Sequence, residues 1–229
     1  MRSLIRPTLN AKTVYLACIS RVRSLLLKAN LESITVSIEA DAQVYEDASQ
    51  NSEWYLFIES DNVDGIVSQA EMEKVYTNRM AKKGAPGRGY YNEIMSISPD
   101  RCPLCGHRPS EQLDHFLPKS KFPSLVVLPV NLIPSCEKCN KLKLDDSPKE
   151  PEEQTLHPYY DDVTNHQWLF VTVIETTPVS FHFFVENVAA FDQELNNRIK
   201  YHFKTFKLNK LYASQTGAFI SDIRFRLTE

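Results

Sequence analysis

The chain has 229 residues, of which 42% are hydrophobic and 24% are charged, and it contains only 6 Gly, the composition of a globular protein. This apolar fraction excludes a disordered polymer, and no run of about 18 apolar residues predicts a membrane span. The net charge is -3, whereas nucleic-acid-binding proteins typically have a positive net charge. Polar residues and Pro7 interrupt the first twelve positions, so we expect no secretory leader and a cytoplasmic protein without a membrane partner.

Charge is distributed along the chain in blocks. Residues 1–30 carry six Arg or Lys and no acidic residue, whereas 31–70 carry nine Asp or Glu and no basic residue. Residues 144–191 carry nine acidic residues against Lys149 alone. Such blocks usually mark solvated faces. The alternative is that the acidic stretches exclude a polyanion or dock a basic partner.

Helices are predicted for most of the first 97 residues. Apolar residues at steps of three and four, including Leu25 and Leu26, predict one amphipathic helix over 10–30. An acidic helix is predicted over 33–48, and the apolar run 51–58 is either a strand or a packed loop. Ser68 and Glu71 form a capping box that predicts a helix ending near the glycines at 84–87, and a short helix follows over 90–97.

The last third of the chain predicts a hairpin and helices. Residues 168–174 and 180–185 are apolar runs on either side of a turn containing Pro178, the pattern of a β-hairpin. After Asp192, apolar residues at helical spacing predict one or two helices.

Four of the five cysteines form two C-x-x-C pairs separated by thirty residues. Each pair places two thiolates on one edge of a tetrahedron, so Cys102, Cys105, Cys136 and Cys139 are predicted to bind a structural Zn²⁺. A redox site would need only one such pair in a βαβ setting, and disulfides are disfavoured in the cytosol. Cys18 lies alone on an apolar face and is predicted to be a core residue.

The segment bracketed by the cysteines carries candidate catalytic residues. His115 titrates near neutral pH unless its surroundings shift it, and can then take a proton from water. Asp114 and Asn140 offer oxygen ligands to a hard cation, Mg²⁺ or Mn²⁺, that would assist phosphodiester hydrolysis. Asp114 and His115 reach one centre only if their strand ends or bends there. The alternative is that the Asp-His pair is a surface or capping feature without a catalytic role and that Asn131 organises a loop.

Residues 102–143 resemble the HNH, or ββα-metal, nuclease motif, in which a β-hairpin and a helix surround one divalent ion. The resemblance implies catalytic positions at His115 and Asn131 and catalytic-metal ligands at Asp114 and Asn140. Asn140 stands where the motif has its last His, and an amide oxygen favours Mg²⁺ or Mn²⁺ over softer ions. The implied fold class is α+β, with a zinc-stapled ββα-metal core, helical N- and C-terminal regions and a hairpin in the C-terminal half.

The stretch 80–162, with its Cys102-Pro103-Leu104-Cys105-Gly106 and Asp114-His115-Phe116-Leu117-Pro118-Lys119 runs, resembles the HNH proteins of Septu-type antiphage systems. These bacterial proteins, some attached to retrons, are paired with an ABC-type or SMC-like ATPase. The resemblance implies a DNA-cutting antiviral effector, with double-stranded DNA and the ATPase subunit as partners. The expected domains are a helical docking or DNA-guiding region (1–97), the nuclease core (98–162), and a hairpin with helices (163–229).

Several basic residues and a histidine are secondary candidates. Contacts to the DNA backbone are predicted for Lys119, Lys138, Lys141 and Lys143, although surface lysines often only interact with water. A flexible basic loop near the core, with Arg79, Lys82, Lys83 and Arg88, is a further candidate for phosphate contact. His157 precedes Pro158 and either packs over the metal site, contacts DNA or belongs to a turn.

Two other classes of function remain open from the sequence. One is a zinc-ribbon nucleic-acid-binding or adaptor subunit in which the motif has only a structural role. The other is an RNA-cutting toxin nuclease.

Overall fold

Helices and three small antiparallel sheets build the fold, as seen in a computed structural model that describes residues 1–228. The first part comprises α1 (Ala11–Ile19), α2 (Leu25–Ser33), α3 (Thr35–Gln50), the 3-10 helix η1 (Trp54–Leu56), β1 (Asn62–Val63), β2 (Val67–Ser68), α4 (Gln69–Tyr76), the π-helix η2 (Thr77–Ala81) and α5 (Arg88–Ser96). The second part comprises β3 (Gln112–His115), η3 (Pro123–Leu125), η4 (Pro129–Asn131), β4 (Leu132–Ser135), α6 (Glu137–Lys143), η5 (Pro151–Glu153), β5 (Leu169–Ile174), β6 (Ser180–Val185), α7 (Gln193–Thr205) and α8 (Leu208–Thr228). The α+β class is therefore confirmed.

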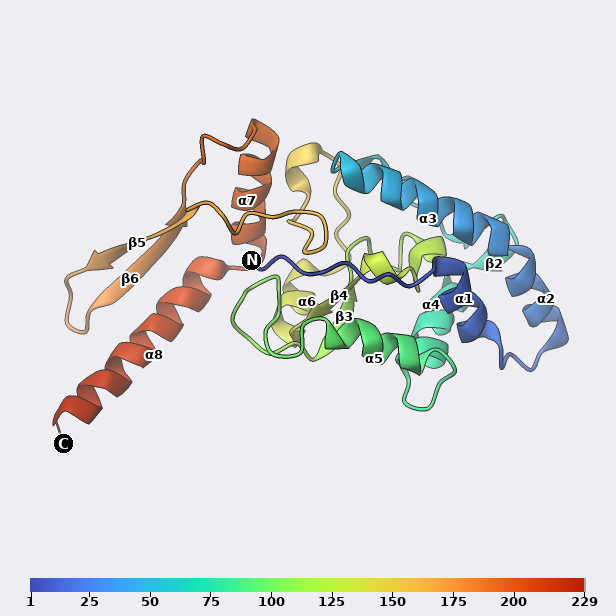
Figure 1. Cartoon of the computed structure of the whole chain (residues 1–229), viewed down its shortest axis with the longest axis horizontal. Helices are drawn as coiled ribbons and strands as arrows, with labels where there is room; N and C mark the ends of the chain where they lie inside the picture. The colour runs from blue at the N-terminus through green and yellow to red at the C-terminus, as the bar shows by residue number, and fades with distance from the viewer. Residues whose placement is uncertain (229) are drawn as a thin grey trace.

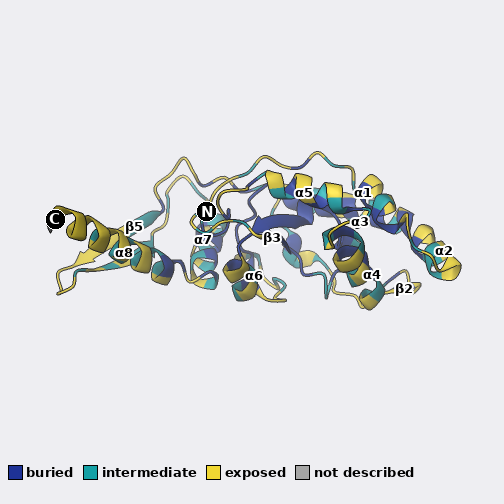
Figure 2. Ribbon diagram, turned by 90° about the horizontal axis from the view of Figure 1, so that it is seen from below, coloured by how far each residue is buried: buried dark blue, intermediate teal, exposed yellow. Residues whose placement is uncertain are grey.

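The strands β3 and β4 lie in the middle of the molecule. Figure 1 shows α1 to α5 on one side of them, whereas the β5–β6 hairpin and α8 extend away at the other end. Figure 2 shows that β3 is buried and that α8 and the hairpin carry mostly exposed or half-buried residues. Within residues 1–228, no helix is long and apolar enough to cross a membrane.

The predicted single helix over 10–30 is wrong, because the chain breaks between α1 and α2. The Ser20 hydroxyl donates a hydrogen bond to the Ala17 carbonyl at 2.7 Å, at the C-terminal cap of α1. The Ser24 hydroxyl accepts from a backbone N–H in the first turn of α2 and caps that helix. The break rotates the second half of the pattern outward, so Leu25 and Leu26 are 85% and 75% exposed.

The other predicted elements are largely confirmed. The acidic helix is α3, and the Ser68 hydroxyl accepts from the Glu71 N–H at 3.4 Å as the cap of α4. The hairpin pairs β5 with β6, and two helices follow Asp192. The run 51–58 is not a strand, since it contains the 3-10 helix η1.

Apolar packing joins the N-terminal helices to the central strands. Tyr15 and Val75 share one buried cluster with Leu113 of β3 and Leu132 of β4. A second cluster surrounds the four paired cysteines and includes Trp54. Residues on both sides of position 97 therefore contribute to common clusters, and the domain boundaries at 97 and 162 stay predictions.

A buried ion pair ties α7 to the segment before the hairpin. Both terminal nitrogens of Arg198 donate to the Asp161 carboxylate, at 3.0 and 2.6 Å, and the two side chains are 2% and 8% exposed. Asp161 also accepts from the His157 N–H at 2.6 Å, and Arg198 donates to the Ser52 hydroxyl at 2.6 Å. Removing one partner of such a pair would leave the other charge buried without compensation.

We expect Arg198→Met to lower the free energy of unfolding by about 3–5 kcal/mol, because the Asp161 carboxylate would lose its counter-ion in the interior. Chemical denaturation followed by circular dichroism measures this. Lys200→Met, at an exposed position of the same helix, is the matched control and should change stability by less than about 0.5 kcal/mol. Equal denaturation midpoints for the two variants would contradict the assigned role.

Candidate metal centre and active site

The four paired cysteines converge in space. Their sulfur atoms lie within 4.8 Å of one another, and all four residues are buried. The first pair, Cys102 and Cys105, sits in a turn closed by a 2.7 Å hydrogen bond from the Gly106 N–H to the Cys102 carbonyl, with Gly106 at φ +65°. In the second pair, Cys136 is the N-cap of α6 and its sulfur accepts from the Cys139 N–H at 3.4 Å. This donor set fits a tetrahedral structural metal such as Zn²⁺.

Hydrogen bonding among the four thiols shifts their pKa values in both directions. Hydrogen bonding from Cys102 lowers the pKa of the Cys136 thiol to about 7 and holds the pKa of Cys105 below its usual range. A thiol must lose its proton before it binds a metal.

The C-terminal helices hold the first cysteine turn in place. The Tyr212 hydroxyl of α8 donates to the Cys105 carbonyl at 2.9 Å. The His202 ring of α7 donates from Nε2 to the Leu104 carbonyl at 2.7 Å, and burial lowers its pKa to about 3, so the ring is neutral at neutral pH. The turn is thus anchored by two side chains from far along the chain.

Directly beside the cysteine cluster, β3 and β4 form an antiparallel pair and α6 follows β4. His115, the last residue of β3, lies opposite Leu132, the first residue of β4. A cavity of about 880 Å³ opens beside them, and Asp114, His115 and Asn140 all border it. The strand does end at His115, as required for two adjacent residues to reach one space.

The His115 ring is fixed by its neighbours. Its Nε2 must donate to the Val126 carbonyl, 2.9 Å away, because a carbonyl only accepts, and its ring meets the Tyr76 ring edge-on with the centroids 4.4 Å apart. Burial lowers the pKa of His115 to about 3, so the imidazole is neutral and does not titrate near pH 7. No described residue donates a hydrogen bond to Nδ1, which leaves that nitrogen with a free lone pair.

Asp114 and Asn140 bring two kinds of oxygen to the same cavity. Asp114 is 9% exposed, and its Oδ1 accepts from the His115 N–H at 2.8 Å. Burial raises the pKa of this carboxyl group, and the nearby Lys143 ammonium opposes the shift. Asn140 is half-buried on α6. A carboxylate and an amide oxygen are ligands suited to Mg²⁺ or Mn²⁺, whose remaining positions water can fill.

Asn131 lies behind the cavity and closes the loop between the two strands. Its Oδ1 accepts from the Leu117 N–H at 2.8 Å, and its Nδ2 donates to the carbonyls of Leu117 and Leu125 at 3.0 and 3.2 Å. The side chain is fully buried and does not border the cavity. It therefore organises the loop that carries Val126, the partner of His115.

The four lysines predicted to contact DNA differ in their surroundings. Lys143 is buried and donates to the His115 carbonyl at 2.8 Å, so it supports the site from within and cannot lie along a DNA backbone, contrary to the prediction. Burial lowers its pKa. Lys119 and Lys141 border the cavity and form ion pairs with acidic residues at 3.4 and 2.6 Å. Lys138 is exposed.

Some residues at the cavity were not singled out from the sequence. Asp145 and Asp146, directly after α6, border it, and their place just beyond the predicted ligand Asn140 is the signal that could have identified them. Two tyrosines hold β3 at Leu113: the Tyr76 hydroxyl donates to its carbonyl at 3.0 Å and the Tyr91 hydroxyl accepts from its N–H at 3.2 Å. Nothing in the sequence pattern marks these two contacts.

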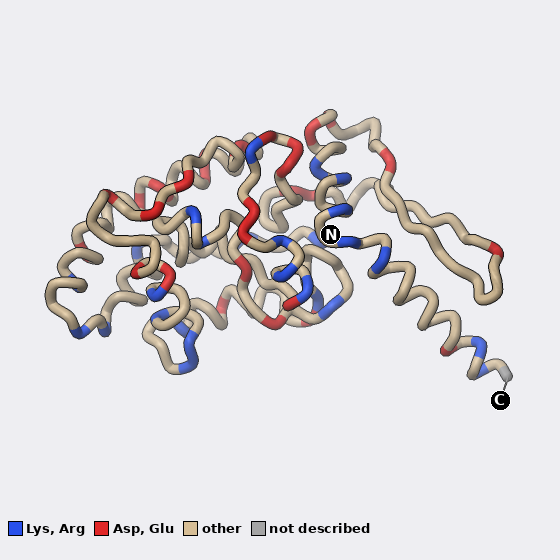
Figure 3. The backbone as a smooth tube through the Cα atoms, turned by 180° about the vertical axis from the view of Figure 1, so that it is seen from behind, with Lys and Arg blue, Asp and Glu red and all other residues tan. Residues whose placement is uncertain are grey.

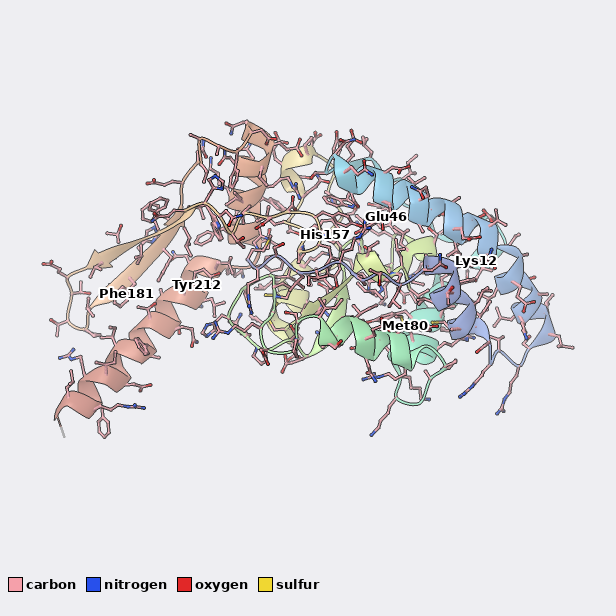
Figure 4. The ribbon with its side chains drawn as sticks, viewed as in Figure 1. Lys12, Glu46, Met80, His157, Phe181 and Tyr212 are labelled. Atoms are coloured by element: carbon pink, nitrogen blue, oxygen red, sulfur yellow. The ribbon has the colours of Figure 1, made fainter. Side chains whose placement is uncertain are left out.

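His157 is a core residue, neither a DNA contact nor a cover for the cavity. Figure 4 shows it on the side of the interior that α3 covers. The Tyr45 hydroxyl lies 3.0 Å from its Nε2, its Nδ1 accepts from the Tyr159 N–H at 3.2 Å, and its ring stacks on Trp54 at 5.1 Å. Burial lowers its pKa well below the usual value. Of the three predicted roles, only the structural one fits.

Part of the chain is similar to two known proteins. It is 33% identical to protein ea31 of Escherichia phage lambda over 165 residues, which cover 70% of this chain and 56% of that protein. It is 39% identical to Septu protein PtuB of Bacillus thuringiensis over 83 residues, which cover 34% of this chain and 31% of PtuB. The chain thus spans about half, or less, of the length of these relatives. No protein-family model and no solved structure gives a significant match.

We expect Cys136→Ser to lose bound zinc and to unfold the region around β3, β4 and α6, because structural zinc contributes about 10–16 kcal/mol of apparent binding free energy. Elemental analysis and thermal unfolding measure both effects. Cys18→Ser, which alters a buried cysteine outside the cluster, is the control and should keep one zinc per chain. A stable Cys136→Ser protein with a full zinc content would contradict a four-cysteine metal site.

Proposed function

We propose that this protein is a metal-dependent HNH DNA endonuclease that acts in antiphage defence. The observation that carries the proposal is the convergence of Asp114, His115 and Asn140 on one cavity beside a four-cysteine cluster. The similarity of part of the chain to a Septu protein supports the defence role. The β3–β4 hairpin followed by α6 would be the ββα-metal core.

In this proposal His115 is the general base. The Val126 carbonyl holds the proton on Nε2, so Nδ1 is the nitrogen that accepts a proton from the attacking water. The buried ring is a weak base in the free protein. An anionic phosphate bound beside the ring raises the pKa of His115, because a nearby negative charge favours the imidazolium ion.

The Asp114 carboxylate and the Asn140 amide oxygen would hold Mg²⁺ or Mn²⁺. The bound ion supplies Lewis-acid activation of the scissile phosphate and stabilises the leaving oxygen. Burial raises the pKa of Asp114, and the Lys143 ammonium is the main influence that opposes this shift and favours the carboxylate. Asn131 acts indirectly, by fixing the loop that carries the Val126 carbonyl.

We also propose that an ABC-type ATPase subunit is the protein partner and that the regions flanking the core dock it or guide DNA. The hairpin and α8 are suited to docking because they extend from the rest of the molecule (Figure 1) and expose large apolar side chains, including Val173 at 55% and Phe219 at 64%. Contiguous exposed apolar surface commonly marks a protein interface.

His115→Ala should reduce plasmid cleavage in Mg²⁺ or Mn²⁺ by about 10²–10⁴-fold, the usual contribution of a general base, and should abolish protection against phage. EDTA should abolish cleavage by the unaltered protein. The control is His182→Ala, which changes an exposed histidine of β6 and should cut normally. Zinc content and thermal unfolding show whether the variant is folded.

The same assay separates the other classes of function. Intact plasmid together with a digested tRNA would identify an RNA nuclease. Intact DNA and RNA with retained DNA binding would identify an adaptor. Full activity in a folded His115→Ala protein would remove His115 from the mechanism.

The ATPase proposal predicts that cleavage depends on the partner. When the full-length protein is isolated from its native cells, we expect an ABC-type ATPase to co-purify with it. The plasmid cleavage rate of the complex should differ from that of the purified chain, because the partner controls a broadly toxic activity. If the chain alone cuts DNA as fast as the complex does, this regulatory role is wrong.

A further inference from the structure

A second cavity, of about 440 Å³, is lined by cationic side chains from two separate segments. Arg21 and Arg23 come from the turn between α1 and α2, whereas Arg79, Lys82 and Lys83 come from η2 and the turn after it. Figure 3 shows Lys and Arg gathered on both turns. Among the described residues that line this basic cavity none is acidic, so five formal positive charges surround one hollow without a counter-ion.

Backbone hydrogen bonds and close packing hold the turn that contributes most of these cations. The Ala85 N–H donates to the Lys82 carbonyl at 3.1 Å, and the Gly87 N–H donates to the Arg79 carbonyl at 2.8 Å. Gly87 also packs closely on Cys18 of α1, where a Cβ would overlap the sulfur atom. These contacts hold the backbone from which the basic side chains extend.

Arg79, which lines this cavity, has one buried donor that lacks an acceptor. The Arg79 Nη1 is buried and makes no hydrogen bond within the described part of the chain. An unsatisfied buried donor costs about 1–3 kcal/mol, and more when it is charged. Its neighbour Cys18 offers no negative charge, because burial raises the pKa of that thiol to about 12.

We propose that the basic cavity binds a backbone phosphate of the nucleic-acid strand that is cut at the His115 site, an inference that rests on the proposed nuclease function. Ala81 borders the cavity of His115, and the next residue, Lys82, borders the basic cavity. Consecutive residues therefore border the two cavities, and the proposed strand would pass from one to the other. A phosphate contact of this kind positions the strand without reading its sequence.

The test is DNA binding by a protein that cannot cut. In the His115→Ala background, Lys82→Gln/Lys83→Gln should weaken binding of a fluorescent DNA duplex about tenfold, as expected for the loss of charge-assisted hydrogen bonds. The slope of log K against log salt should fall by about 1, the value for one phosphate contact. Both lysines are exposed, so the fold should tolerate the change.

The matched control removes the same charge elsewhere. Lys200→Gln/Lys204→Gln changes two exposed lysines of α7, outside both cavities, and should leave the affinity within about twofold of the parent, because dispersed surface charges contribute little. Equal affinities of the two double variants would overturn the proposal. The proposal would also be overturned if inorganic phosphate binds in the cavity while Lys82→Gln/Lys83→Gln has no effect on duplex binding.

The binding readout separates this inference from the nuclease proposal. If the unaltered protein fails to cut DNA, the nuclease proposal fails, and the duplex-binding comparison still tests the basic cavity. If the unaltered protein cuts and the two double variants bind alike, only the basic-cavity proposal is wrong.

Discussion

The four-cysteine cluster is the constraint on which the geometry of the candidate site depends. Cys102 and Cys105 precede β3, and Cys136 begins α6, so one bound metal would fix both ends of the segment that carries Asp114 and His115. Closing a segment of this length costs conformational entropy in an unfolded chain. A metal with four thiolate ligands can offset that cost, because its binding free energy is also folding free energy. Short strands of four residues each would otherwise hold this arrangement weakly.

A buried polar network then sets the position of His115 within that frame. Asn131 holds the loop, the loop places the Val126 carbonyl, and that carbonyl fixes the ring. Lys143 fixes the backbone of His115 from the opposite side. Hydrogen bonds in a low-dielectric interior are strong when every group is paired, and they orient side chains more tightly than apolar contacts do. Burial also keeps the ring neutral, because it lowers the pKa of His115.

Residue spacing predicted the parts of this arrangement that depend on local chemistry. Ser68 predicted the start of α4, because a helix cap acts within one turn of chain. Each C-x-x-C pair is equally local, and the convergence of the two pairs was predicted because one tetrahedral metal takes four ligands. The break before α2 was missed because the apolar repeat continues across it, although Ser24 is a helix-capping residue. The burial of Lys143 and His157 depends on contacts with residues distant in the sequence, which no local pattern encodes.

Segregated charge reconciles a net charge of -3 with the proposed nucleic-acid substrate. Four of the nine acidic residues of 31–70 lie on α3, where Figure 3 shows Asp and Glu along the helix. The basic cavity takes its side chains from the turn after α1 and from η2 and the turn after it. The acidic surface would repel a polyanion and the basic surface would attract it. This distribution of charge would therefore limit where DNA can lie on the protein. Because the basic cavity adjoins the His115 cavity at Ala81 and Lys82, this separation of charge would lead the backbone toward the candidate catalytic residues.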